Sequence, residues 1–296
     1  MANHSPALRV DPLSDQSGRT WLITGATNGV GLETARSAAR AGAHLILPAR
    51  NAPRGELIAD ELRQLGAQVD TAPLDLADLA SVRRFADTVN EPVDVLVNNA
   101  GTISTRRRES ADHFELLLAT NFLGPFALTN LIAEHLTERV VIVGSGAHRT
   151  GHVDAADPHF RHRRWTMSAA YAQSKLCDML WAVALQSRLD GRGSVQVQLA
   201  HPGWAVTNLQ NATGIRQLDR AVTAVCGLFG QPAAAGALPI LAAATAELPA
   251  LSYLGPDGFQ QLKGQPELQQ PSALARDPAA AEAVWDLGVR ETGTDL

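Results

Sequence analysis

The chain has 296 residues, of which 45% are hydrophobic and 19% are charged, and its formal net charge is −5. These proportions are those of a globular protein and exclude an intrinsically disordered chain. The negative balance argues against nucleic-acid binding, which normally uses a basic surface.

Cysteine content and the first residues narrow the possibilities further. Cys177 and Cys226 do not have metal-ligand spacing, and two cysteines in so long a chain indicate a reducing compartment rather than a disulfide framework. Residues 1–18 have no apolar core of a signal peptide and are expected to form a loose leader. No run of about 18 uncharged apolar residues occurs, so we expect no membrane span. The histidines and cysteines show no ligand cluster, so we expect no metal. Together these features predict a cytoplasmic location.

From Thr20 onward, short apolar runs alternate with stretches of helical periodicity. Helices that separate strands rich in Val, Ile and Leu are typical of a parallel sheet covered on both faces. We therefore predict an α/β fold: a single doubly wound Rossmann-type domain over residues 19–296, with a parallel sheet of about seven strands and helices on both faces. The expected strands include residues 20–24, 44–48, 67–72, 93–97, 139–143 and 194–200.

Two long helices are expected later in this pattern, residues 111–136 and the helix that contains Tyr171. Residues 204–232 and 255–275 interrupt the alternation with Gly, Pro and Gln, and are candidate loops on the substrate side. The apolar residues of the first loop suit either a substrate pocket or core packing. They are Trp204, Leu209, Ile215, Leu228 and Phe229.

The first expected strand runs into a glycine-rich turn, TGATNGVG, which opens the following helix. Glycines let a backbone approach a pyrophosphate, and the helix N-terminus attracts its charge. Gly25, Gly29 and Gly31 are not spaced as in the common Gly-x-Gly-x-x-Gly pattern, so a tight turn without a ligand is the alternative. The position in the first strand–helix unit favours a nucleotide site.

The second expected strand is followed by Arg50. An acidic side chain is expected here when a protein binds the ribose 2′-hydroxyl of NAD, and none occurs before Glu56. The guanidinium of Arg50 suits a 2′-phosphate, which favours NADP(H). A solvated surface arginine is the alternative.

The fourth expected strand is followed by NNAG, residues 98–101. Ligands of open α/β sheets bind beyond the C-terminal ends of the strands, so these residues are candidate cofactor contacts. An ordinary Asn/Gly turn is the alternative.

The chain has only two tyrosines and two lysines, and Lys175 follows Tyr171 by four positions. That spacing places both side chains on one face of a helix. Lowering the pKa of a tyrosine from about 10 to about 7 takes roughly 4 kcal/mol. A lysine charge about 4–5 Å away supplies roughly 3–4 kcal/mol at an effective dielectric near 20, so Lys175 makes Tyr171 a usable general acid or base.

Taken together, these motifs resemble those of the short-chain dehydrogenase/reductase family. TGATNGVG, NNAG and YAQSK resemble its nucleotide loop, its fourth-strand motif and its Tyr-x3-Lys pair. Asp75-Leu76 resembles the pair that contacts adenine, and HPGWAVT resembles the Pro-Gly-x3-Thr motif after the sixth strand. The resemblance runs from about Thr20 to Thr207. LPARN and SYLGPDG, the second an expected last strand, resemble the branch of retinol-dehydrogenase-like and WW-domain-oxidoreductase-like proteins.

The resemblance implies an oxidoreductase that uses NADP(H) on an alcohol/ketone or aldehyde pair, with an apolar small-molecule substrate. Ser145 would donate a hydrogen bond to the substrate oxygen, and Asn121 would hold a water that relays protons through Lys175. The catalytic residues would be Asn121, Ser145, Tyr171 and Lys175. The cofactor-binding residues would be Gly25, Thr27, Asn28, Gly29, Val30, Gly31, Arg50, Asn51, Asp75, Leu76, Asn98, Ala100, Gly101, Tyr171, Lys175, Pro202, Gly203 and Thr207.

Residues 146–170 make the interval between Ser145 and Tyr171 about twice as long as in many family members, which indicates an insertion of irregular chain. Its basic cluster, residues 159–165, is either a solvated lid face or a grip on an acidic substrate. The resemblance also implies a homo-oligomer formed by helix 111–136 and the Tyr171 helix. Apolar residues on these helices suit either core or interface: Leu116, Leu117, Leu180 and Leu185.

Two other classes of function share parts of this pattern. A non-catalytic NADP(H)-binding sensor or regulator would use the nucleotide site, but it has no need of the complete Asn-Ser-Tyr-Lys set. A lyase-like relative with an anion pocket would have no need of the glycine loop. Cofactor-dependent turnover separates these alternatives from an oxidoreductase.

Overall fold

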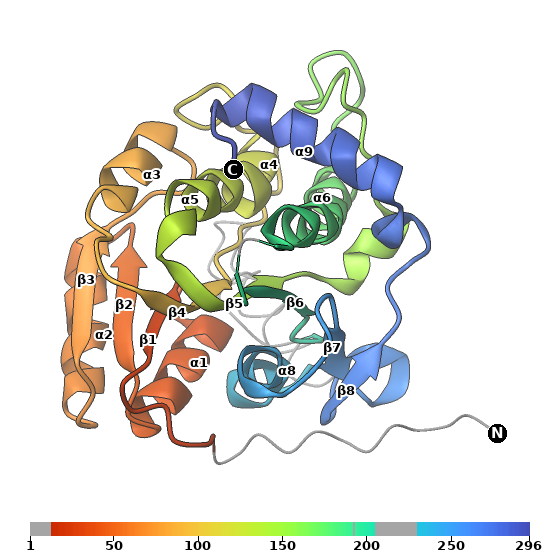
Figure 1. Ribbon diagram of the computed structural model, residues 1–296. Helices are drawn as coiled ribbons and strands as arrows, with labels where there is room; N and C mark the ends of the chain where they lie inside the picture. The colour runs from red at the N-terminus through yellow and green to blue at the C-terminus, as the bar shows by residue number, and fades with distance from the viewer. Residues whose placement is uncertain (1–12, 192, 205–229) are drawn as a thin grey trace, which may run out of the picture.

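The computed structural model describes residues 13–191, 193–204 and 230–296, which form an eight-stranded sheet with helices on both faces (Figure 1). The strand order is β3-β2-β1-β4-β5-β6-β7-β8, so the order reverses between β1 and β4. The doubly wound α/β fold predicted from the sequence is confirmed. The strands are β1 (Thr20–Ile23), β2 (His44–Ala49), β3 (Val69–Pro73), β4 (Val93–Asn98), β5 (Leu136–Val143), β6 (Gln196–Ala200), β7 (Tyr253–Pro256) and β8 (Pro266–Gln269).

The edge strand β8 was not predicted. β1 to β7 pair in parallel, whereas β8 pairs antiparallel with β7. β8 lies inside residues 255–275, which were expected to be loop because the sequence there has no apolar run. An edge strand has one neighbour and tolerates Pro and polar residues, so it lacks the signal of a buried strand.

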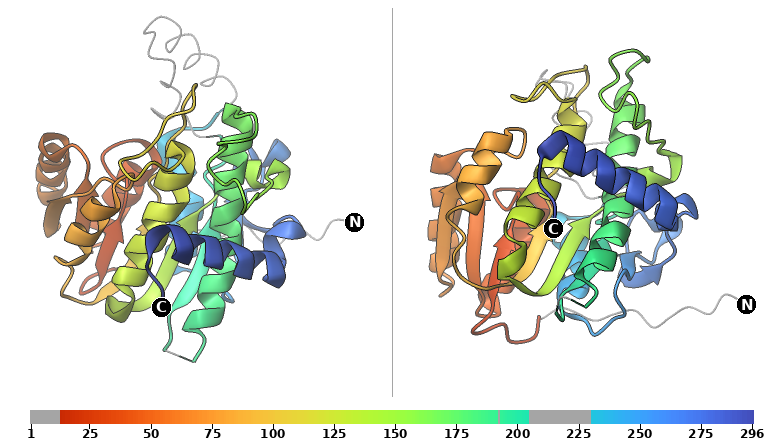
Figure 2. Two further views of the ribbon diagram at one scale, coloured as in Figure 1. Left: turned by 90° about the horizontal axis from the view of Figure 1, so that it is seen from above. Right: turned by 45° about the horizontal axis from the view of Figure 1, so that its top comes forward.

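The helices divide between the two faces of the sheet. α1, α2 and α8 pack on one face, and α3, α5, α6 and α9 pack on the other (Figures 1 and 2). Their bounds are α1 (Gly29–Arg40), α2 (Ala52–Arg63), α3 (Leu79–Ala86), α5 (Gly124–Leu131), α6 (Met167–Leu189), α8 (Ala233–Thr245) and α9 (Pro278–Thr292).

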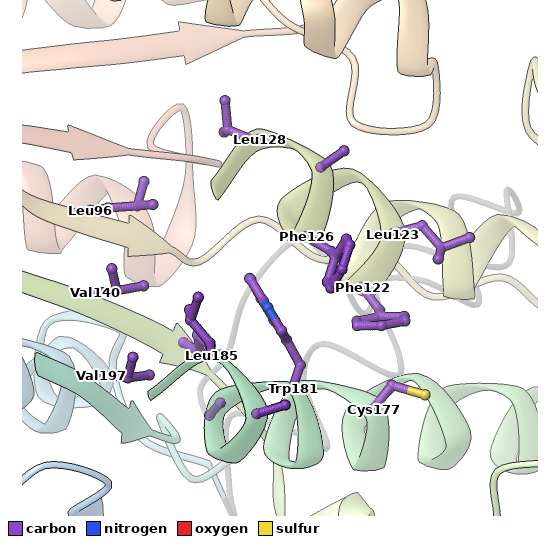
Figure 3. Close-up of a cluster of buried hydrophobic side chains, with 14 of the residues drawn as sticks. Leu96, Phe122, Leu123, Phe126, Leu128, Val140, Cys177, Trp181, Leu185 and Val197 are labelled. Atoms are coloured by element: carbon purple, nitrogen blue, oxygen red, sulfur yellow. The ribbon is translucent and has the colours of Figure 1, made fainter. Parts of the chain in front are cut away.

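Aromatic side chains form the centre of the core beneath α5 and α6 (Figure 3). The ring of Trp181 lies 6.2 Å from that of Phe122 and 6.1 Å from that of Phe126. All three side chains are fully buried. Burying a ring of this size stabilises the fold by about 1.5–3 kcal/mol. Cys177 packs in the same core, as expected, whereas Cys226 lies outside the described residues.

The expected helix 111–136 is broken into pieces. Residues 111–115 form a turn, and Glu115 caps the short helix α4 (Leu116–Leu118) by accepting a hydrogen bond from the Leu118 N–H. A π-helical stretch, η1 (Ala119–Leu123), follows and leads into α5, and a 3₁₀ turn ends the segment at His135. The apolar periodicity of these residues did not show whether they form one long helix or several short helical segments.

The helix α9 covers the outer face of α5 and α6 (Figure 2). Its Trp285 ring lies 4.8 Å from the Phe126 ring. The Arg188 guanidinium of α6 stacks 4.0 Å over Trp285 and pairs with Glu282 of α9 at 2.7 Å. The two helices that were expected to form an oligomer interface are therefore covered by a helix of the same chain.

The position of α9 bears on four leucines that the sequence left open between core and oligomer interface. Leu117, Leu180 and Leu185 are buried within the chain, and Leu116 is half-buried. The core interpretation is correct for the first three. The assembly state itself stays a prediction, and it requires a surface other than these buried positions.

Two further sequence expectations concern segments outside the sheet. Of the expected leader 1–18, the described part packs on the domain, since Gln16 is buried and its N–H donates to Ala41 O at 2.7 Å. Among the described helices, none is both long enough and apolar enough to cross a lipid bilayer.

Candidate active site

A cavity of about 1080 Å³ opens at the C-terminal ends of the parallel strands. Open α/β sheets bind their ligands at this edge, where the strand order reverses. The cavity brings together three predicted catalytic residues, Ser145, Tyr171 and Lys175. Its wall includes the predicted cofactor residues Gly25, Thr27, Asn28, Val30, Gly31, Arg50, Asp75, Leu76, Ala100, Gly101, Pro202 and Gly203. Gly29, Asn51, Asn98 and Asn121 are not wall residues, and Thr207 lies outside the described residues.

The glycine turn between β1 and α1 depends on two close backbone approaches. Gly25 has a φ of +71°, and a Cβ there would lie 2.8 Å from Ala100 Cα. A Cβ on Gly31 would lie 2.3 Å from Asn99 Nδ2 and 2.5 Å from Gly25 O, so only glycine fits at either position. Asn28, the N-cap residue of α1, makes no side-chain cap hydrogen bond. The N-terminus of α1 therefore suits a pyrophosphate.

The two asparagines of NNAG point in different directions. Asn98 is buried, and its Nδ2 donates to Thr129 Oγ1 of α5 at 3.1 Å. Asn99 lines the cavity, and its Nδ2 donates to Thr24 O at 2.8 Å and to Gly25 O at 3.4 Å. Asn99 thus holds the glycine turn, whereas the list of predicted cofactor-binding residues named Asn98 from this motif. The alternation of side chains along a strand is the signal that separates the two.

The end of β2 presents Arg50 to the cavity. Its side chain is exposed, and no acidic partner of it occurs among the described residues. Asn51 instead caps α2, where its Oδ1 accepts a hydrogen bond from the Arg54 N–H at 2.9 Å. Asp75 lies in the wall, and its Oδ1 accepts from the Ala77 N–H at 3.0 Å. Arg50 is therefore the residue of this strand end that is placed to meet an anion.

Tyr171 and Lys175 lie one turn apart on α6, and both line the cavity. The ammonium of Lys175 is buried, and it donates to Val143 O at 2.9 Å and to Asp178 Oδ2 at 2.8 Å. Burial lowers the pKa of Lys175, but the charge of Asp178, with a smaller contribution from Tyr171, more than reverses that effect and raises the pKa. The ammonium therefore keeps its charge. Asp178 is missing from the predicted set, although its spacing of three from Lys175 puts both on one helix face.

Asn121 lies behind the wall in the π-helical stretch η1. Its Oδ1 accepts from the Thr102 N–H at 2.7 Å, and its Nδ2 donates to Ser174 Oγ at 2.9 Å. A Cβ built on Gly101 would lie 3.6 Å from Asn121 Oδ1 and 4.0 Å from Lys175 Nζ. The amide of Asn121 and the ammonium of Lys175 therefore flank the same point of the cavity wall.

The π-helical turn that contains Asn121 is followed by Pro125 in the first turn of α5. Pro125 has no N–H, so it cannot make the α-helical hydrogen bond to the carbonyl four residues earlier, which belongs to Asn121. Single π-helical turns inside helices are frequent at functional sites. A carbonyl oxygen has two lone pairs, so that of Asn121 can also accept from the relay water implied by the family.

Ser145 follows β5 and begins the short 3₁₀ helix η3 (Gly146–Thr150). Its Oγ accepts from the Ala147 N–H at 3.2 Å, so its own proton remains for a substrate oxygen. Behind it, the Ser272 N–H donates to Nε2 of His148 at 3.2 Å, which assigns the ring proton to Nδ1 and lets that nitrogen donate to Ser145 O at 2.6 Å. Burial lowers the pKa of His148, so the ring stays neutral and ties the Ser145 loop to the C-terminal part of the chain.

Part of the remaining wall of the cavity is apolar. It includes Ile103, Met167, Trp204 and Leu262. The Trp204 N–H donates to Leu262 O at 2.8 Å, which joins the two candidate substrate-side loops. Four of the apolar residues predicted for the first loop lie outside the described residues: Leu209, Ile215, Leu228 and Phe229.

The inserted segment 146–170 is anchored by a buried carboxylate. Glu115 Oε1 accepts from Trp165 Nε1 at 3.1 Å, and the Glu115 N–H donates to His159 Nδ1 at 3.1 Å. None of residues 159–165 is in the cavity wall. His159 is buried, whereas Arg161, His162 and Arg164 are exposed. The structure therefore favours a solvated face for these three residues and does not support a grip on an acidic substrate.

The comparisons with known proteins agree with this geometry. The short chain dehydrogenase family model matches residues 19–217. The chain belongs to the short-chain dehydrogenase/reductase family. Polyprenol dehydrogenase of Mus musculus is 38% identical over 95% of this chain and 86% of its own length. Retinol dehydrogenase 13 of Homo sapiens is 35% identical over 94% of this chain and 86% of its own length. The similarity supports the retinol-dehydrogenase-like branch of the family.

Solved structures of this family share the fold. An uncharacterised protein of Mycobacterium paratuberculosis is 37% identical, with a TM-score of 0.82 and a coverage of 98% of both chains. An NAD(P)-dependent gluconate 5-dehydrogenase from Beutenbergia cavernae, solved with bound NADP, is 27% identical, with a TM-score of 0.63 over 78% of this chain and 91% of its own. This short-chain dehydrogenase/reductase is accordingly a hydride-transferring oxidoreductase that acts on CH–OH groups.

Proposed function

We propose that this short-chain dehydrogenase/reductase uses NADP(H) and interconverts an apolar alcohol with its ketone or aldehyde. The observation that carries the proposal is the Tyr171–Lys175 pair, which shares one cavity with Ser145 and with the glycine turn. A non-catalytic sensor would have no use for a charged lysine buried beside a tyrosine at the end of the nucleotide cleft.

The residues present fit a dinucleotide. The turn at Gly25 and Gly31 leaves no room for side chains, and the N-terminus of α1 offers N–H groups to a pyrophosphate. Asp75 and Leu76 would hold the adenine, as the family implies. When bound, the nicotinamide supplies or accepts the hydride.

In the reductive direction, Tyr171 donates its phenolic proton to the substrate oxygen. Ser145 donates a hydrogen bond to the same oxygen and stabilises the charge that develops there. The ammonium of Lys175 favours the phenolate that Tyr171 leaves behind. A water on the backbone carbonyl of Asn121 would return a proton by way of Lys175. Oxidation of an alcohol uses the same groups in reverse.

The preference for NADP(H) rests on Arg50. The side chains of Pro48 and Ala49, at the end of β2, accept no hydrogen bond from a ribose hydroxyl. The guanidinium of Arg50 lies in the cavity wall without an acidic partner among the described residues, and it can bind a 2′-phosphate through charge-assisted hydrogen bonds.

The apolar wall at Ile103, Met167, Trp204 and Leu262 supports an apolar substrate. The names of the polyprenol and retinol dehydrogenases agree with this class. A homo-oligomer and a cytoplasmic location stay predictions of the sequence. The mass in light scattering and the localisation of a tagged chain test them.

The test is turnover by a matched pair of tyrosine variants on a panel of retinal, a short polyprenal, a steroid ketone and an aliphatic aldehyde with NADPH. Tyr171→Phe removes only the proposed proton donor, so it should bind NADPH and lose about 10²–10⁴-fold in kcat. Tyr253→Phe removes the hydroxyl of the other tyrosine, which is buried and has no hydrogen-bond partner in the described residues, and should keep its activity. Near-wild-type kcat in Tyr171→Phe would reject the proposal.

A further inference from the structure

A buried ion pair lies directly behind the proposed proton donor. Lys175 Nζ and Asp178 Oδ2 are 2.8 Å apart, and their side chains are only 7% and 2% exposed. Lys175 also donates to Val143 O at 2.9 Å. Two of the three ammonium hydrogens are thus fixed by the protein, and the third is left for the cavity.

We propose that Asp178 is a positioning residue of the reaction, an inference that rests on the proposed role of Tyr171. Its carboxylate fixes the ammonium of Lys175 and offsets its charge. In this way it sets the pH at which the Tyr171–Lys175 pair releases its first proton. Oxidation of an alcohol begins with loss of this proton. Asp178 therefore moves the acid limb of the pH profile of kcat/KM for oxidation to higher pH.

Both parts of the role follow from the burial of the pair. An isolated ammonium in a buried site is disfavoured, so the counter-charge of Asp178 stabilises the charged form of Lys175. The same counter-charge reduces the pull of Lys175 on the proton of Tyr171. Tyr171 and Asp178 are seven residues apart on one helix, about 10 Å along its axis. At an effective dielectric near 20, one charge at that distance moves a pKa by about one unit.

Asp178 itself is ionised at neutral pH. Burial raises its pKa to about 6, against the opposing effect of Lys175. Its second oxygen, Oδ1, is buried and accepts no hydrogen bond from the described residues. Few hydrogen bonds therefore offset the cost of burying the charged carboxylate. Above that pH the carboxylate offsets the lysine charge, and below it the offset is lost.

Lys175 is the charged group that acts on Asp178. The same helix also carries Tyr171, Cys177 and Arg188, and Arg188 lies ten residues further along, where it pairs with Glu282. β6 and η1 carry no titratable side chain, and Glu138 and Arg139 lie toward the opposite end of β5. Among the described residues, no hydrogen bond or ion pair joins Asp178 to the titratable groups of η3, of α9, of the 3₁₀ helix η6 (Leu274–Arg276) or of the cap of α4. Those groups are Glu115, His148, Arg149, Arg276, Glu282, Asp286, Arg290 and Glu291.

The test compares Asp178→Asn with Glu115→Gln. Asp178→Asn removes the charge but keeps an oxygen that can accept from Lys175. Glu115→Gln removes the charge of another fully buried carboxylate, one that touches neither Lys175 nor the cavity. The pH profile of kcat/KM for alcohol oxidation should move its acid limb down by about one unit in Asp178→Asn and stay in place in Glu115→Gln. Asp178→Ala also removes the anchor and should lower the plateau kcat by about 10²-fold.

A second readout needs no substrate. The chain has two tyrosines, and burial raises the pKa of Tyr253, so phenolate absorbance that is lost in Tyr171→Phe is assigned to Tyr171. Its midpoint should fall in Asp178→Asn, and Tyr171→Phe should remove the signal. Asp178→Ser, also uncharged, serves if the asparagine variant does not fold.

The outcomes separate the two proposals. An unchanged or raised acid limb and phenolate midpoint in the uncharged variants would overturn the role of Asp178 while Tyr171→Phe still abolishes turnover. Wild-type turnover in Tyr171→Phe would overturn the proposed function itself. Equal shifts in Glu115→Gln would show a general effect of lost charge and would also overturn the role of Asp178.

Discussion

Gly31→Ala tests the nucleotide turn by adding one methyl group at its tightest point. The new Cβ would lie 2.5 Å from Gly25 O, whereas ordinary contact begins at 3.4 Å, so that backbone oxygen has to move by about 0.9 Å. Asn99 also has to move, because its Nδ2 would lie 2.3 Å from the methyl group. Overpacking of this kind costs about 1–3 kcal/mol. If the distortion is paid in the binding conformation, the Kd for NADPH rises by roughly 5- to 150-fold.

The assay is a titration of NADPH fluorescence, with thermal unfolding to verify that the variant folds. Gly146→Ala is the matched control, since it adds the same methyl group to the wall of the same cavity at a point where nothing lies within 4 Å. Its Kd should stay within about twofold of the wild type. A Kd for Gly31→Ala as tight as that of the control would refute the assignment of this turn to the pyrophosphate.

Two further variants test the cofactor choice and the covering helix. Arg50→Ala should weaken NADP(H) by about 10- to 150-fold in kcat/KM and leave NAD(H) little changed, and a wild type that uses both cofactors equally would contradict the preference. Trp285→Ala should lower the free energy of unfolding by about 3–5 kcal/mol in urea, because it removes a fully buried ring from the contact of α9 with Phe126. A loss below about 1 kcal/mol would show that α9 contributes little to the core.

The sequence predicted the strands that are buried on both faces, because such strands appear as continuous apolar runs. Runs such as HLILP and VDVLV have no polar face, so their place in a covered parallel sheet followed from composition alone. β8 has the opposite character, since only its pairing with β7 makes it a strand. The break at η1, which lies just before Pro125, was likewise not predicted, because the apolar periodicity of this segment matched that of one long helix.

The sequence predicted those parts of the candidate site in which the residues that act together belong to one short motif. Tyr171 and Lys175 are one helical turn apart, so their proximity is local. Asn99 required a decision about which of two adjacent asparagines faces the cavity. Glu115 and His159 come together across 44 residues, and no local pattern shows that a buried carboxylate holds the insertion in place.

The position of α9 has a consequence for the order of folding. The strands and helices up to α6 can be synthesised and begin to pack while residues 278–292 are still missing. During that time the aromatic side of α5 and α6, including Phe126, has no cover. Exposed apolar surfaces on partly folded chains promote aggregation. We therefore expect nascent chains that stop before α9 to bind chaperones, and the transition to a soluble domain to coincide with the emergence of Trp285 from the ribosome.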